Sequence, residues 1–187
     1  LPRIVDPGRS AFAQDGIHFV KSCRDDTGIE YWRDDNDGLT RILIALSFIE
    51  IGTAFTDDGS KRNATCQGVI VNIGSTYDTD TGNAEPVSYI DEVMAFIGNL
   101  RNFAAYRMAP IIAVVPSVTQ SQMFASMDAT RVRTIRGAWM SAAAQLDGVF
   151  IVDMQNVSLA PSSNPWPVPD EQGVVAMAKG IAAILGD

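Results

Sequence analysis

The side chains that could carry catalysis or bind a metal are few. The chain has one histidine, His18, and two cysteines, Cys23 and Cys66. One imidazole excludes every mechanism that needs two. Two thiols and one imidazole also cannot complete a structural zinc site, which takes four cysteines or two cysteines with two histidines. The sequence leaves open whether Cys23 and Cys66 form a disulfide or remain buried thiols.

A loop rich in acidic residues, hydroxyl groups and glycine runs from Gly74 to Pro86. Asp78 and Asp80, with Asn83 and the residues between, could coordinate a hard cation through oxygen, as calcium sites do. The EF-hand spacing fails, because Gly82 comes one position early and no glutamate closes the loop. We interpret the segment as a solvated turn and expect neither a metal nor another cofactor.

Aromatic residues lie in segments that have the composition of loops. They are Tyr31, Trp32, Tyr77 and Trp166. Aromatic faces on loops above a sheet can stack against sugar rings, so a carbohydrate-binding set is one interpretation. Packing of these loops onto the core is the other. Trp139 lies on a helical stripe instead, and we assign it to the core.

The charge and the apolar runs of the sequence limit the kinds of partner that we expect for this chain. Fourteen Lys and Arg residues against 22 Asp and Glu residues give a net charge of −8, which repels nucleic acid. The longest apolar run, Ile42–Phe48, is far shorter than the roughly 20 residues that cross a bilayer, so we expect no membrane span. A length of 187 residues predicts one domain over residues 1–187.

The second half of the chain alternates buried strands with amphipathic helices. We predict strands at 68–73, 111–115 and 149–152, and helices at 88–105, 128–146 and 170–185, the last capped by Asp170. On the second helix the apolar stripe comprises Val132, Ile135, Trp139, Met140 and Ala143. This order predicts an α/β fold, with a parallel sheet and helices on both faces.

In parallel sheets of this kind, binding and catalytic sites usually lie at the carboxyl ends of the strands. We therefore expect the functional residues in the loops that open at Gly74, Pro116 and Asp153. In the first half, Arg3–Val5 is a short strand candidate and Leu39–Phe55 an apolar helix candidate. The segment Cys23–Gly38 has the composition of an irregular surface excursion.

The order of these pieces resembles the SGNH or GDSL hydrolase superfamily, and within it the sialate O-acetylesterase type of carbohydrate esterase. The resemblance rests on Gly8-Arg9-Ser10 after a short apolar run, on the block Val69–Asp78, on the strand 111–116 that ends in proline, and on the helix that opens at Gly173. It implies a three-layer, flavodoxin-like α/β domain. It also implies Ser10 as nucleophile and Gly74 with Ser75 on the oxyanion side.

The catalytic end of the family pattern is altered. The family places Asp-x-x-His before the terminal helix, and this chain has Pro165 and Val168 there. A serine is nucleophilic only when a positioned base accepts its proton, so Ser10 without that base is an ordinary alcohol or the polar start of a helix. His18 lies eight residues from Ser10 and is expected to be a bystander.

These departures predict a degenerate SGNH-like domain that binds or displays without catalysis. We expect Tyr77, Asp78 and Trp166 to contact a glycan, and a homo-oligomer or larger extracellular or virion assembly as context. Two alternatives stay open. One is an active carbohydrate O-acetylesterase that uses Ser10 with an unlocated base. The other is a purely structural assembly subunit.

Overall fold

The computed structural model describes residues 24, 26–33, 38–42, 68–74, 77–103, 106–118, 127–157 and 170–185. The chain forms two compact units, one of Leu1–Asp25 with Asp34–Thr65 and one of Asp26–Arg33 with Cys66–Asp187. In the first unit, residues 38–42 are helical. The rest of the helix expected at Leu39–Phe55 and the strand expected at Arg3–Val5 lie outside the described residues. The single-domain expectation stays a prediction.

The second unit is built on a parallel sheet of three described strands in the order β1-β2-β3. These strands are β1 (Val69–Val71), β2 (Ile111–Val115) and β3 (Val149–Asp153). Ile111 of β2 is in register with Val69 of β1 and with Val149 of β3. All five residues of β2 are buried, which is why its sequence is an unbroken apolar run rather than an alternating one.

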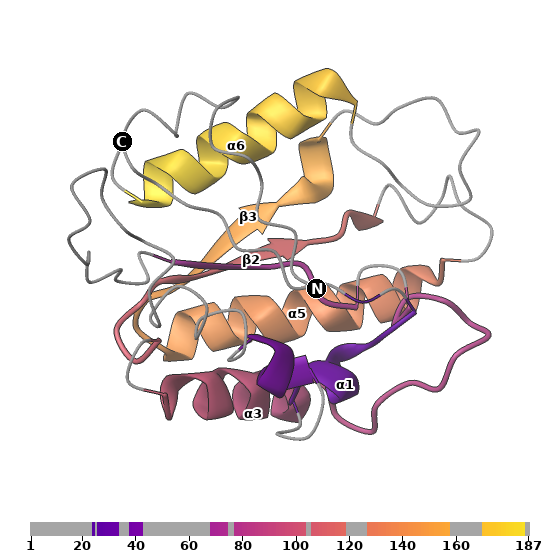
Figure 1. The fold of residues 1–187 in the computed structure, drawn as a ribbon. Coiled ribbons are helices and arrows are strands. Elements are labelled where there is room, and N and C mark those ends of the chain that lie inside the picture. The colour runs from indigo at the N-terminus through magenta and orange to yellow at the C-terminus, as the bar shows by residue number, and fades with distance from the viewer. Residues whose placement is uncertain are drawn as a thin grey trace. The chain divides into compact units, whose positions relative to one another are not determined.

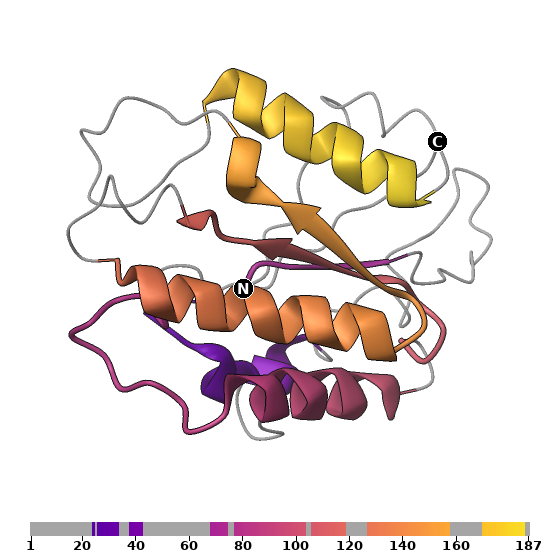
Figure 2. The same cartoon turned by 180° about the vertical axis from the view of Figure 1, so that it is seen from behind.

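Helices follow each strand and enclose the sheet from both sides. They are α3 (Tyr89–Arg101), α5 (Ala129–Gln145) and, after the short 3-10 helix η4 (Met154–Asn156), α6 (Glu171–Leu185). Within this unit, α3 and α5 lie on one side of the sheet and α6 on the other (Figures 1 and 2). The predicted α/β class is therefore confirmed as a three-layer, flavodoxin-like fold.

The segment Cys23–Gly38 departs from expectation, because it contains the five-residue helix α1 (Ile29–Arg33). Ile29 is fully buried, and Trp32 is 6% exposed with its indole N–H donating to Thr27 Oγ1 at 3.1 Å. The assignment of Tyr31 and Trp32 to a loop was wrong, since both lie in α1, whereas the burial of Trp32 agrees with the interpretation that it packs onto the core. One and a half turns are too short to show a 3.6-residue period among the surrounding acidic residues.

The core has a part on each side of the sheet. On the α5 side, Val132, Ile135 and Trp139 are buried as predicted, and the Trp139 ring meets Phe96 of α3 edge to face with centroids 6.4 Å apart. Met140 is 41% exposed, so its place on the stripe was wrong. On the α6 side, buried Ile112, Val114, Val152 and Met154 pack against Met177, Ile181 and Ile184.

Aspartates fix the starts of two helices. Asp128 accepts hydrogen bonds from the amides of Thr130 and Arg131 at the start of α5, at 2.6 and 3.0 Å. Asp170 accepts from the amide of Gly173 at 2.8 Å, which confirms the predicted cap. Among the described helices, none is both long and apolar enough to span a bilayer.

The Phe96–Trp139 contact leads to a stability prediction. Trp139→Ala removes a large buried ring, and we expect it to lower the free energy of unfolding by about 3–5 kcal/mol. Met140→Ala, at the exposed neighbouring position, should change it by less than about 1 kcal/mol. Chemical denaturation of the two variants and the wild type measures both. Equal losses in the two variants would contradict the packing described here.

Candidate functional site

The carboxyl ends of the three strands lie at one edge of the sheet, because the strands are parallel. The loop after β1 passes Gly74 and leads through residues 77–88 to α3. Pro116 and Ser117 follow β2, and η4 follows β3 directly. The described polar groups of this edge form three clusters, around Asp78, around Arg131 and around the Arg136–Asp153 ion pair.

Asp78 is a buried carboxylate, 3% exposed, that joins three segments. Its Oδ2 accepts a hydrogen bond from the backbone N–H of Ile29, the first residue of α1, at 2.9 Å. The same oxygen accepts from the phenol of Tyr89, the first residue of α3, at 2.9 Å. The side chain thus fixes the starts of two helices relative to the loop that follows β1.

Two glycines make room for this carboxylate. A Cβ at Gly28 would lie closer than 3.0 Å to Asp78 Oδ1, and one at Gly74 closer than 3.0 Å to Asp78 Oδ2 and to the Tyr89 hydroxyl. Gly74 also has φ +71°, a conformation that side chains with a Cβ seldom adopt. Both positions therefore require glycine for reasons of space.

Burial sets the protonation of Asp78. Desolvation raises the pKa of the Asp78 carboxyl, and the hydrogen bonds from Ile29 and Tyr89 oppose that rise only in part. Nearby Glu30 adds to the rise, while Arg131 opposes it. Desolvation, followed by the charge of Asp78, likewise raises the pKa of Tyr89 well above its ordinary value, so the phenol remains the donor.

The far end of α1 is also held by α3. The Arg33 guanidinium binds both carboxylate oxygens of Glu92 at 2.7 Å. The Asn99 side-chain amide donates to the carbonyl of Arg33 at 3.0 Å. Together with the Asp78 contact, these bonds fasten α1 to the rest of the second unit at both of its ends.

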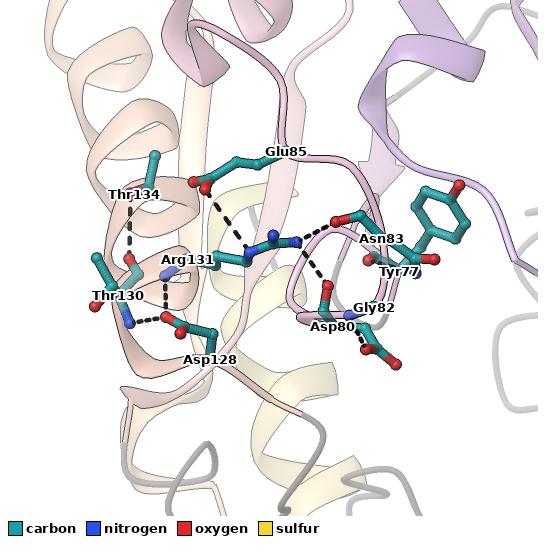
Figure 3. Close-up of polar contacts among 9 residues, drawn as sticks. All are labelled: Tyr77, Asp80, Gly82, Asn83, Glu85, Asp128, Thr130, Arg131 and Thr134. Atoms are coloured by element: carbon teal, nitrogen blue, oxygen red, sulfur yellow. Dashed lines mark hydrogen bonds and ion pairs between the residues drawn. The ribbon is translucent and has the colours of Figure 1, made fainter.

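The loop 77–85 is tied to α5 through Arg131 (Figure 3). One guanidinium nitrogen donates to the carbonyls of Asp80 and Asn83 at 2.6 and 2.8 Å, and Nε lies 3.7 Å from a Glu85 oxygen. Within the loop, the Asn83 side chain donates to the carbonyl of Tyr77 at 3.0 Å. The loop backbone is therefore fixed from inside and from the neighbouring helix.

A third cluster closes the edge between β2 and β3. Arg136 of α5 forms a two-pronged ion pair with Asp153 at 2.6 and 2.7 Å and also donates to the carbonyl of Pro116. This pairing holds the pKa of Asp153 below its usual range. Ser117 is fully buried, with its Oγ 3.4 Å from the Gln155 side-chain oxygen.

A shallow hollow of about 630 Å³ lies between the start of α3 and the middle of α5, and its lining includes Glu85 and Tyr89 of the clusters described above. Residues 85–90 form one side of it, and Thr134, Gly137, Ala138 and Ser141 form the other. None of the predicted site residues that the structure describes lines it. We therefore place the candidate site at the loop 77–83 and not in the hollow.

Part of the predicted site falls on described residues. Gly74, Tyr77 and Asp78 lie together, since the side chains of Tyr77 and Asp78 both flank Gly28. Ser10, Ser75, Trp166 and His18 lie outside the described residues, as do Pro165 and Val168. In the part of the chain that is described, no group of three or more His, Cys, Asp or Glu side chains could hold a metal ion.

Sequence reasoning did not single out Tyr89, Arg131 or Arg136. Tyr89 was assigned only to the helix after the loop, and both arginines look like ordinary surface charges of an amphipathic helix. Each partner of theirs lies between 11 and 51 residues away in the sequence. Because the partners lie far apart in the sequence, no short pattern of residues indicates these contacts.

The comparisons with known proteins support the fold of the chain and give no information on its activity. No protein-family model and no curated protein matches the sequence. The crystal structure of a protein from Arabidopsis thaliana is similar, with a TM-score of 0.56 and 20% sequence identity. The likeness covers 86% of this chain but 57% of that one. At this identity it supports the α/β fold alone, and the SGNH resemblance stays a prediction.

The raised pKa of Asp78 gives a pH prediction with a definite sign. The folded carboxyl holds its proton more tightly than the unfolded one, so its contribution is fully present below the unfolded pKa and is lost as pH rises through the folded pKa. The stability of the wild type relative to Asp78→Asn should therefore increase as pH falls from about 7 to about 4. Denaturation of both proteins across this range measures it.

Asp128 provides a control of opposite sign. The amides of Arg131 and Thr130 lower the pKa of its carboxyl, so its contribution is present above the unfolded pKa and is lost as pH falls through the folded pKa. The advantage of the wild type over Asp128→Asn should then shrink as the pH falls below about 4. If both aspartates gave the same slope, the buried environment assigned to Asp78 would be wrong.

Proposed function

We propose that this chain is a non-catalytic, SGNH-hydrolase-like domain that binds carbohydrate on the surface of the loop 77–83, as a module of an extracellular or virion assembly. The observation that carries the proposal is the place of Asp78. Its carboxylate is buried and accepts hydrogen bonds from Ile29 and Tyr89, so it orders the loop and does not face a ligand. The expectation that Asp78 itself contacts a glycan is therefore not retained.

The surface of the loop offers the groups that hold sugars. Tyr77 is half-buried, and its ring projects from the loop on the side away from the Arg131 guanidinium (Figure 3). Thr81 and Gly82 of the same loop are exposed. An aromatic face next to polar groups of fixed position suits a pyranose, because little entropy is lost when an already ordered loop binds.

The described carboxylates near the ends of the strands favour binding over hydrolysis. An ester hydrolase needs a base within hydrogen-bond reach of its nucleophile. Asp78 holds α1 and α3, Asp128 caps α5, and Asp153 pairs with Arg136. Each of these acids already binds donors that hold the fold together, which leaves the loop surface for recognition.

Carbohydrate binding is tested with a glycan array, followed by calorimetry with the glycan that binds best. We expect Tyr77→Ala to weaken that binding by roughly ten-fold, since it removes the stacking face. The control is Phe150→Ala, which removes a 40% exposed aromatic ring from β3. Unchanged affinity in Tyr77→Ala would place the ligand elsewhere.

Hydrolysis is tested separately with nitrophenyl acetate and an O-acetylated sugar. Wild type and Ser10→Ala should both give only the rate seen in buffer, because Val168 and Pro165 replace the family's base and its carboxylate. A turnover that disappears in Ser10→Ala would replace this proposal with an active esterase.

A further inference from the structure

Loops rich in Asp, Asn and Gly are often ordered by a bound cation, which carbonyl and carboxylate oxygens surround. In the loop 77–85 such oxygens converge on a side chain instead. The carbonyls of Asp80 and Asn83 and the carboxylate of Glu85 all face the Arg131 guanidinium (Figure 3).

We propose that Arg131 takes the place of a bound cation in this loop and is the residue that positions its binding surface. The functional meaning rests on the proposed function, since the surface concerned is the one that carries Tyr77. The physical claim concerns the loop alone: its shape depends on a covalently attached positive charge and not on a metal ion.

The position of Arg131 is fixed at its base as well as at its tip. Asp128 caps the first turn of α5 and donates its own backbone N–H to the carbonyl of Thr79 at 2.8 Å. Asp80 forms a bridge with Met127 just before the helix. The root of the arginine side chain and the loop that it binds are therefore held side by side before the guanidinium makes any contact.

The contacts at the tip set the width of the turn. One nitrogen binds the carbonyls of Asp80 and Asn83 together, which fixes the distance across the turn. Asn83 then passes this restraint to the backbone of Tyr77 through its side-chain amide. The Arg131 side chain is 16% exposed, so these charge-assisted bonds are partly shielded from water and salt.

The test is amide hydrogen exchange at Asp80, Gly82 and Asn83, whose N–H groups bond within the loop. Arg131→Met keeps the aliphatic stem and removes the charge and the donors. We expect exchange at these amides about ten-fold faster than in the wild type, with the sheet amides unchanged. Arg133→Met, an exposed arginine two residues further along α5, is the matched control and should match the wild type.

Two further exchange measurements, each with a compound added to the protein, distinguish a role of the Arg131 charge from packing of its aliphatic stem. Free guanidinium ion, well below denaturing concentration, should restore part of the protection in Arg131→Met, whereas the same concentration of sodium chloride should not. Wild-type exchange should not respond to calcium or to a chelator.

The proposal is overturned if Arg131→Met exchanges like the wild type, if sodium restores protection as well as guanidinium, or if calcium or a chelator changes wild-type exchange. The wild-type titration remains decisive even when the variant fails to fold. Because no sugar is used, a negative result here is distinct from failure to find a glycan.

Discussion

The structure of the second unit depends on how one buried carboxylate is accommodated. A carboxylate taken out of water costs several kcal/mol unless donors replace the lost hydration. Asp78 meets this requirement with one backbone N–H and one phenol, and it fits only because Gly28 and Gly74 have no Cβ. The start of α1, the turn after β1 and the start of α3 must therefore adopt mutually compatible positions.

Asp78 and Arg131 order this edge from opposite sides. The Asp78 carboxylate binds the starts of α1 and α3 and joins them to the loop. The Arg131 guanidinium binds the loop carbonyls and joins the loop to α5. Both groups are largely shielded from solvent, since Asp78 is 3% exposed and the Arg131 side chain 16%. The loop presents to solvent the half-buried Tyr77, the exposed Thr81 and Gly82, and the exposed carboxylate of Glu85.

The sequence predicted the part of the fold that depends on local periodicity. The three strands of the second half and the helices after them match expectation within a few residues, because buried strands and amphipathic helices repeat their apolar residues at fixed spacing. The Asp170 cap was predictable because it stands just before the last of these periodic segments. The helix α1 was missed because five residues cannot establish a period.

The candidate site was predictable only in outline. That a loop after β1 would matter followed from the parallel topology, and Gly74, Tyr77 and Asp78 lie there together. The role of Asp78 did not follow, because a sequence shows that an aspartate is present and not that it is buried. The partners of Asp78, Tyr89 and Arg131 come from other elements, and only the fold brings them into range.

The attachment of α1 has a consequence for how the molecule assembles. An isolated helix of five residues has no stability in water, since the cost of its first turn is not recovered. Its amide partner Asp78 lies 49 residues along the chain and its ion-pair partner Glu92 lies 59 residues along. The helix is therefore stable only where Asp78 and α3 hold it, so this early segment of the chain depends for its order on parts of the second unit that follow it in the sequence.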